Sequence, residues 1–548
     1  MSFDLRHAIW LPYRRRSGKI EWSAPAAMVD RITDDPVVAI ATPRPDFDGA
    51  VTEFLIGLMT AALLPETEEE WRALWLQPPS ESVLQARLEA LPNAFDLDGS
   101  GPRFLQDQSV ADFADVDVDP IQDLLVNAKN SGLFIKPGVV NRMGRPAAAM
   151  ALITMQAYST AGGRGFRTSV RGGGPLTTLV DPRRLDEAES TLWQLVWANV
   201  ETMAQLKARG DTSTDRVSDT YPWMGVTRTS EAKGASTTSV DAHPLQAYFG
   251  MPRRIRLEFA NQSGACDITG QDDTDVAIGF RGRPYGVNYE RWHHPLSPYY
   301  AGKEPNELLP VHGQPGGVGW RDWLGLLHGG SAAPGKAPAL TVANFGAKRA
   351  QRIGRARHSL RIFGYDASNA KIRAWISSVL PAFAESDPDR LAAIDAAVRA
   401  LVDATERAGY VLQQSVATAL HARADDAPGD LTYIKAALWN ATQDWFYREL
   451  DQLVTGGEIA FAAIDLKRRY RHLLTTETLR VFDELVPGDA TSADLLRRIV
   501  RARFGLFTTL HGGGNIGQQI FAALGEVTSV EKAKRRKQSV KSKAGESE

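Results

Sequence analysis

The sequence predicts an α+β protein in which a large, irregular mixed α/β N-terminal domain is followed by a C-terminal four-helix-type bundle. Single domains usually stop growing at about 250 to 300 residues, and this chain has 548. Near residue 369 the sequence changes from glycine- and proline-rich to long stretches of alanine, leucine, arginine and glutamate. We therefore expect an N-terminal domain over residues 1–368, a helical domain over 369–527 and a basic, disordered tail over 528–548.

The N-terminal part contains short β-rich runs and few clear helices. Residues 254–259 (RIRLEF) alternate as a half-buried strand does. Residues 47–64 carry apolar side chains at helical spacing, and Asp46 is placed to cap this helix. We expect its charge-poor face to lie in the core.

The C-terminal part predicts helices over residues 371–384, 387–424, 431–454 and 459–485. A further helical segment, 492–524, is interrupted by three glycines at 512–514. Short polar connections favour antiparallel packing of such helices into a bundle.

Composition is that of an ordinary globular protein, with 43% hydrophobic and 23% charged residues and a net charge of −2. A single cysteine, Cys266, excludes an internal disulfide and indicates a reducing compartment. The sequence shows no signal peptide and no apolar run near the roughly 18 residues of a membrane span. We expect a cytoplasmic protein without membrane association.

The segment 531–548 holds seven basic and three acidic residues, so this tail either stays disordered or contacts phosphates.

Motifs for enzyme chemistry are incomplete. HGGG at 511–514 resembles an oxyanion-hole loop, but no Gly-x-Ser-x-Gly accompanies it. Asp115, Asp117 and Asp119 alternate as carboxylate ligands can on a strand, yet nothing supplies the rest of a metal site. The glycine-rich segment 162–175 lacks the lysine of a P-loop. We expect no enzyme activity, no metal and no cofactor.

Two segments combine arginine with features suited to DNA. Residues 161–180 place glycine clusters around Arg164, Arg167 and Arg171; glycine lets the main chain approach a phosphate backbone, and arginine supplies forked hydrogen bonding. A tight loop packed inside the domain explains the same pattern equally well. A second cluster, within 253–256, alternates with apolar residues and is weaker evidence, because its arginines can simply form a solvated face.

Ordered sequence blocks carry a family resemblance over nearly the whole chain. They are WLPYRR from Trp10, PRPDFD from Pro43, GPRFLQD from Gly101, RGGGPLTTLV from Arg171, MPRRIRL from Met251, HPLSPYY from His294, HGQPGGVGWRDWL from His312 and FGYDASNAK from Phe363. Together they resemble the CasA family, the large subunit of the type I-E CRISPR complex Cascade. The resemblance implies a non-catalytic subunit that recognises the protospacer-adjacent motif while the guide RNA reads the target.

The resemblance also implies a set of DNA-binding residues. The family's glycine loop matches Gly162, Gly163, Arg164 and Gly165, with arginine where some relatives have glycine. Its lysine finger matches Lys303, and its wedge hairpin, which separates the first base pairs, matches Ser368 and Asn369. Ser368 and Asn369 can alternatively, or in addition, cap the first bundle helix.

A mobile loop and a set of partners complete what the resemblance implies. The loop matches residues 130–143, with Asn130 at its start and Leu133, Phe134 and Ile135 at its tip. Zinc-binding cysteines of some relatives fall on Gly144 and Ala147, so we expect no zinc.

The implied partners are the other Cascade subunits, the CRISPR guide RNA, double-stranded target DNA and the helicase-nuclease. Two alternatives remain: an architectural subunit that reads no motif, and a metal-dependent hydrolase.

Overall fold

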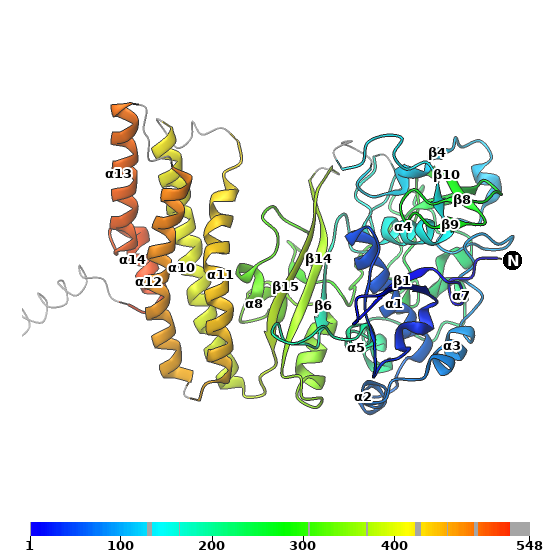
Figure 1. Cartoon of the computed structure of the whole chain (residues 1–548), viewed down its shortest axis with the longest axis horizontal. Coiled ribbons are helices and arrows are strands. Elements are labelled where there is room, and N and C mark those ends of the chain that lie inside the picture. The colour runs from blue at the N-terminus through cyan, green and yellow to red at the C-terminus, as the bar shows by residue number, and fades with distance from the viewer. Residues whose placement is uncertain are drawn as a thin grey trace, which may run out of the picture. The chain divides into compact units, whose positions relative to one another are not determined.

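The structure is a computed structural model, and it describes residues 2–128, 134–163, 165–304, 307–368, 371–421, 429–457, 459–486 and 492–526. The chain divides into two compact units (Figure 1). Unit 1 comprises Met1–Gly317, Leu326–Gly329 and Gly335–Ala384, and unit 2 comprises Val318–Gly325, Gly330–Pro334 and Glu385–Glu548. The expected boundary after residue 368 is therefore displaced to residue 384, because residues 357–383 form one hairpin of unit 1. The expected tail lies outside the described residues.

Unit 1 is built around a central buried helix, α1. Its helices are α1 (Pro45–Leu63), α2 (Glu68–Leu76), α3 (Glu81–Glu89), α4 (Arg145–Tyr158), α5 (Leu192–Ala198), α6 (Met203–Lys207), α7 (Val217–Thr220) and α9 (Leu340–Asn344), while α8 (Trp323–Leu327) runs from unit 2 into unit 1. Phe54 of α1 packs edge-on against Phe104, with ring centroids 5.5 Å apart, and against Phe249 at 6.3 Å. Such buried aromatic contacts place α1 in the core on more than one face.

The start of α1 differs from the expectation. The helix begins at Pro45, with Arg44 as its N-cap residue, because the fixed φ of proline suits the first helical position. Asp46 lies in the first turn and does not cap. Its buried carboxylate instead accepts hydrogen bonds from Arg44 (2.7 Å) and from the hydroxyl of Tyr365. Asp46, which we expected to cap α1, therefore connects this helix to Tyr365 in the hairpin of residues 357–383.

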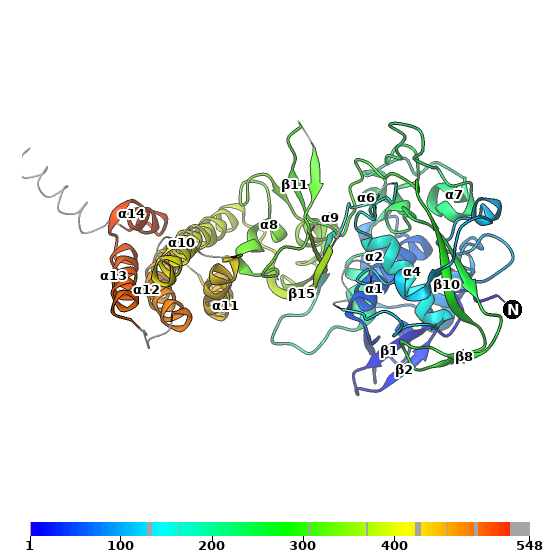
Figure 2. The same cartoon turned by 90° about the horizontal axis from the view of Figure 1, so that it is seen from above.

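The strands of unit 1 form several small sheets (Figure 2). Three have the orders β2-β1-β3, β12-β11-β13 and β15-β14-β6. In a fourth sheet, β10 pairs with β4, β5 and β7. The strands β8 and β9 form a fifth, two-stranded sheet. Their bounds are β1 (Leu11–Arg15), β2 (Ile20–Ser23), β3 (Val37–Ile40), β4 (Asp119–Pro120), β5 (Met143–Gly144), β6 (Leu176–Asp181), β7 (Arg254–Phe259), β8 (Gly264–Ala265), β9 (Asp272–Asp273), β10 (Val276–Arg283), β11 (Tyr299–Ala301), β12 (Leu308–Pro310), β13 (Lys336–Ala337), β14 (Arg357–Ser368) and β15 (Lys371–Phe383). The strand predicted at 254–259 is confirmed as β7.

The helix predicted over residues 371–384 is wrong, because this segment is strand β15. Ile372, Ile376 and Leu380 are buried at four-residue intervals, which fits one face of a helix but equally fits alternate positions on one face of a strand. Pro381 would break a helix interior. The long partner strand β14 decides between the two, since it pairs with β15 from end to end.

Unit 2 is helical, as predicted. Its helices are α10 (Pro388–Leu420), α11 (Thr432–Thr455), α12 (Ile459–Leu485), α13 (Ala493–Leu510) and α14 (Gly514–Ala523). Asp387 caps α10 by accepting hydrogen bonds from the backbone N–H groups of Asp389 (2.9 Å) and Arg390 (3.3 Å). The predicted interruption at 512–514 separates α13 from α14. The α+β class is thus confirmed.

A segment distant in sequence packs into these helices. Trp320 is fully buried, and its ring stacks on Phe446 of α11 with centroids 4.5 Å apart. Its indole N–H donates to the carbonyl of Trp439 (3.1 Å). Residues 318–325 therefore belong to unit 2 although they precede the hairpin of unit 1.

Within the described ranges, no single helix is long and apolar enough to cross a membrane. One pair, α1 with α2, meets the length and composition criteria jointly, but it is bent by 114° at the break.

Burial of His358 on β14 predicts a pH-dependent stability. Burial lowers the pKa of His358 to about 4, below the value of about 6.5 expected in the unfolded chain. The unfolded state therefore binds a proton that the folded state does not, so unit 1 should lose up to about 3 kcal/mol as pH falls from about 6.5 through about 4. Urea unfolding across this range should show a smaller loss for His358→Leu. The exposed His472→Leu serves as the control, and an unchanged pH profile in His358→Leu would contradict the assignment.

Candidate nucleic-acid interface

The first glycine cluster forms a loop whose two ends meet at Ser159 and Ser169. The backbone N–H of Ser169 donates to the carbonyl of Ser159 (3.4 Å). Between these ends, Gly162 and Gly163 are exposed, and Gly163 has a φ of +93° with no atom within 4 Å of the position its Cβ would take. The loop thus presents bare main chain to solvent, as close approach to a ligand requires. Arg164 lies outside the described residues, and its role stays a prediction.

Gly165 packs the loop against the segment around Tyr285. Its φ is +81°, and a Cβ there would lie 2.8 Å from the Cβ of Pro284. The carbonyl of Gly165 accepts a hydrogen bond from the backbone N–H of Tyr285 (2.6 Å). Tyr285 itself has a φ of +59°, which costs a non-glycine residue about 1 kcal/mol or more. Sequence reasoning missed Tyr285, because only its left-handed conformation in the fold singles it out.

Arg167 holds the loop from the same side. Its Nε donates to the hydroxyl of Ser230 (2.7 Å) and its Nη2 to the carbonyl of Ser230 (3.2 Å). Ser230 in turn donates its hydroxyl to the carbonyl of Gly286 (2.8 Å). For Arg167, the alternative of a tight loop packed inside the domain is therefore the one that the hydrogen bonds favour.

Arg171 is a core residue and not a phosphate ligand. Its side chain is 2% exposed and forms an ion pair with Glu53 of α1 at 2.7 Å. Its Nη1 donates to the hydroxyl of Thr177 on β6 (2.9 Å). A carboxylate partner compensates the burial of this charge, so for Arg171 too the alternative of a tight loop packed inside the domain is the one that the contacts favour.

The second glycine cluster joins the three elements predicted to contact DNA. At Gly173, a Cβ would lie 3.3 Å from the Cα of Thr160, at the base of the glycine loop. The carbonyl of Gly173 also lies 2.7 Å from Nδ1 of His312, just after β12. At Gly174, whose φ is +69°, a Cβ would lie 3.2 Å from the carbonyl oxygen of Tyr365 on β14. Glycine is required there because the loop, the β11–β12 hairpin and the β14–β15 hairpin meet at this turn.

Lys303 lies in the turn between β11 and β12. It is exposed, and it forms no ion pair with a described residue. The turn is closed by the backbone N–H of Gly302, which donates to the carbonyl of Glu307 (2.8 Å). At the other end of this hairpin, Pro310 lies 3.9 Å from the Cβ position of Gly172. The hairpin carrying the predicted lysine finger thus contacts the second glycine cluster.

The predicted wedge lies at the end of the longest hairpin of unit 1. β14 and β15 pair from Arg357 with Phe383 to Ser368 with Lys371. Ser368 is exposed, while Asn369 lies outside the described residues. Since Ser368 belongs to a strand of unit 1, the alternative that it caps the first bundle helix is excluded; that cap is Asp387.

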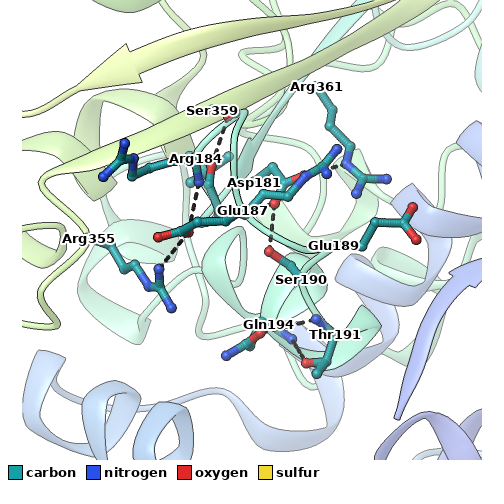
Figure 3. A network of polar contacts seen from close by, with 12 residues as sticks. Asp181, Arg184, Glu187, Glu189, Ser190, Thr191, Gln194, Arg355, Ser359 and Arg361 are labelled. Atoms are coloured by element: carbon teal, nitrogen blue, oxygen red, sulfur yellow. Dashed lines mark hydrogen bonds and ion pairs between the residues drawn. The ribbon is translucent and has the colours of Figure 1, made fainter. Parts of the chain in front are cut away.

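A buried carboxylate fixes the opposite end of this hairpin (Figure 3). Asp181, at the end of β6, accepts hydrogen bonds from Nε of Arg361 on β14 (2.7 Å) and from the hydroxyl of Ser190 (2.7 Å). Burial alone would raise the pKa of Asp181, but Arg361 and its other partners lower it. The hydroxyl of Ser359 donates to the carbonyl of Arg183 (2.8 Å). The hairpin is therefore anchored by hydrogen bonds as well as by its backbone ladder.

The predicted mobile loop is only partly described. Asn130 and Leu133 lie outside the described residues, whereas Phe134 is 43% exposed and Ile135 is buried. Phe134 can therefore contact a partner. Ile135 is buried in unit 1, and its expected place at the functional tip stays a prediction.

Gly144, one of the two positions at which the resemblance would place a zinc-binding cysteine, lies beside Cys266. A Cβ at Gly144 would lie 3.4 Å from the Cβ of Cys266. Next to them, Arg145 forms an ion pair with Asp273 at 2.6 Å. Among the described residues, no group of three or more histidine, cysteine, aspartate or glutamate side chains is placed to hold a metal ion.

The strand β7 buries arginines that the sequence left as a possible solvated face. Arg254 is buried and pairs with Asp107 at 2.6 Å. Arg256 donates to the carbonyl of Asp107 (2.6 Å). These two side chains therefore hold β7 against the segment around Asp107, with Arg254 buried and Arg256 half-buried.

This fold, a mixed α/β unit with loops joined at a glycine turn and a separate helical unit, is that of CRISPR-associated proteins. Thermobifida fusca Cse1 matches with a TM-score of 0.68 at 18% identity, covering 93% of this chain and 97% of that one. Thermus thermophilus CasA matches at 0.65 and 18%, covering 93% and 99%. A chain of a CRISPR RNA-guided surveillance complex matches at 0.63 and 17%, covering 92% and 99%. The family CRISPR-associated protein Cse1 matches residues 4–481, and the chain belongs to this family.

The geometry of the glycine loop predicts that two glycines tolerate alanine differently. Gly165→Ala should combine the strain of a positive φ, about 1 kcal/mol, with the clash against Pro284. Gly163→Ala should add the strain alone, because its Cβ would meet open space. Hydrogen exchange at the amide of Tyr285 should therefore accelerate more in Gly165→Ala than in Gly163→Ala. Equal exchange rates in the two variants would contradict this account.

Proposed function

We propose that the protein is the DNA-recognition subunit of a type I-E Cascade, an RNA-guided CRISPR surveillance complex in the cytoplasm. In this role it catalyses no reaction. It recognises the protospacer-adjacent motif in duplex DNA through the minor groove and helps to start strand separation, while the guide RNA reads the target by base pairing. Membership of the Cse1 family supports the complex, as does the fold shared with a chain of a CRISPR RNA-guided surveillance complex.

The observation that carries the proposal is the meeting of three elements at Gly172–Gly174. The glycine loop, the hairpin of Lys303 and the hairpin of Ser368 come from distant parts of the sequence, yet each contacts this turn. These contacts join the bases of the three elements, and we infer that a DNA duplex bound beside them meets bare main chain, a cation and a projecting hairpin. These are the features needed for groove approach, phosphate attraction and insertion into a base step.

Strand separation has an energetic requirement that the hairpin can meet. Unstacking a base step costs a few kcal/mol, which an inserted side chain offsets by its own contacts. Asn369 follows Ser368 in sequence, and its amide can donate hydrogen bonds to unpaired bases and accept them. We assign the first opening step to this residue.

The remaining partners are the other Cascade subunits, the guide RNA and the helicase-nuclease. Phe134 supports contact with one of them, because a large apolar side chain at 43% exposure gains stability when a partner covers it. Unit 2 is a second compact unit, and we propose it as a further docking surface for these partners.

Asn369→Ala should slow opening of the target duplex without preventing assembly of the complex. We expect R-loop formation to be about tenfold slower, equivalent to about 1.4 kcal/mol in the barrier. Permanganate reactivity of unpaired thymines in the reconstituted complex measures the rate. Asn440→Ala on α11 removes an exposed amide elsewhere and serves as the control. On a target whose first base pairs are already mismatched, Asn369→Ala should act as the wild type; a persisting defect there would refute the wedge assignment.

Lys303→Ala should weaken binding to the duplex in a salt-dependent way. Removing one phosphate contact reduces the slope of log affinity against log salt by about 0.9. Affinity of the reconstituted complex should be measured on targets differing only in the flanking trinucleotide. The wild type should discriminate among them, Lys303→Ala should show the lower slope on all of them, and Lys207→Ala on α6 should match the wild type. Wild-type affinity indifferent to the trinucleotide would favour an architectural subunit instead.

A further inference from the structure

Arg253 lies directly beneath the exposed glycine loop. Its side chain is buried, its Nη2 donates to the carbonyl of Thr160, and its guanidinium lies 5.4 Å from the ring centre of Phe166. A Cβ at Gly162 would lie 2.7 Å from Nη1 of Arg253. Because Gly162 is itself exposed, this cation lies close to the surface that the glycine main chain forms.

The charge of Arg253 has no carboxylate partner among the described residues. The other arginines buried to this degree each form an ion pair with aspartate or glutamate: Arg6, Arg15, Arg171, Arg254 and Arg349. Nε of Arg253 is buried without any hydrogen-bond partner. Burial lowers the pKa of Arg253 to about 10, so the side chain remains protonated at neutral pH.

An unpaired buried charge is unfavourable in the free protein. No nearby carboxylate offsets the cost of removing this charge from water. Ionisable groups whose pKa is shifted by burial are concentrated at functional sites. The surroundings of Arg253 have a low dielectric constant and screen its positive charge only weakly. The charge therefore produces a positive electrostatic potential at the nearest surface. That surface is the stretch at Gly162 and Gly163, which has no side chains to hold an anion away.

We propose that Arg253 is a positioning residue that draws a phosphate of the flanking duplex onto the glycine loop. The inference rests on the proposed function and adds a cation that the resemblance did not assign. In this arrangement glycine at position 162 has two roles: it lets the DNA approach from outside, and it lets the guanidinium approach from inside. The loop then binds DNA through main chain and a buried charge together.

A purely structural role for Arg253 makes a different prediction. Its hydrogen bond to Thr160 could simply hold the loop, in which case the charge itself would be unimportant. Arg253→Gln removes the charge and keeps an N–H donor, while Arg253→Lys keeps the charge. The two variants therefore separate charge from hydrogen bonding.

The experiment measures affinity of the reconstituted complex for its preferred target over a range of salt concentrations. Arg253→Gln should bind about three- to tenfold more weakly, with the slope of log affinity against log salt reduced by up to about 0.9. Arg253→Lys should keep the wild-type slope. Arg87→Gln, which removes an exposed charge on α3, should leave slope and affinity unchanged.

Gly162→Ala provides an independent arm if Arg253→Gln does not fold. Its Cβ must displace the guanidinium or the loop, so the slope should fall although no charge is lost. A wild-type slope in both Arg253→Gln and Gly162→Ala, or equal losses in Arg253→Gln and Arg253→Lys, would overturn the inference. Failure of the proposed function is recognised separately, because the wild-type complex would then ignore the flanking trinucleotide.

Discussion

The ion pair between Arg171 and Glu53 fixes the part of the chain on which the interface depends. Arg171 stands between the two glycine clusters, and its guanidinium is tied to α1 and β6 in the core. Removing one member of such a buried pair leaves the other charge buried without a partner, which lowers the free energy of unfolding by about 3–5 kcal/mol. With Arg171 immobile, the turn at Gly172–Gly174 has a fixed position, and the loop and both hairpins are set relative to it.

Much of the fold could be predicted because it follows from local pattern. The bounds of α12 agree with the predicted 459–485, and β7 agrees with 254–259, since periodicity of apolar residues is visible within one segment. The segment 371–383 was misassigned because its apolar spacing fits a helix and a strand alike. Only its pairing with β14, and not its own sequence, identifies β15.

The candidate site was predictable by residue type but not by orientation. Glycine clusters and arginines marked the right segment, yet Arg171 points inward to Glu53, 118 residues away in sequence. For Arg253 the sequence left weak evidence for DNA contact and a solvated face as alternatives, and this residue lies under the loop with no carboxylate partner among the described residues. No local signal distinguishes a paired arginine from an unpaired one, because the carboxylate that would pair with it is supplied by a distant element.

The β14–β15 hairpin also has a mechanical consequence. It packs so closely on α1 that a Cβ at Gly49 would lie 2.9 Å from the rings of both Phe363 and Trp375. Arg361, near the far end of the same hairpin, is bound by Asp181, and Tyr365, nearer Ser368, is bound by Asp46 on α1. Because the hairpin is held against α1 at these points, a force on its end should bend it little. The force should instead act on α1, the tightly packed central helix of unit 1.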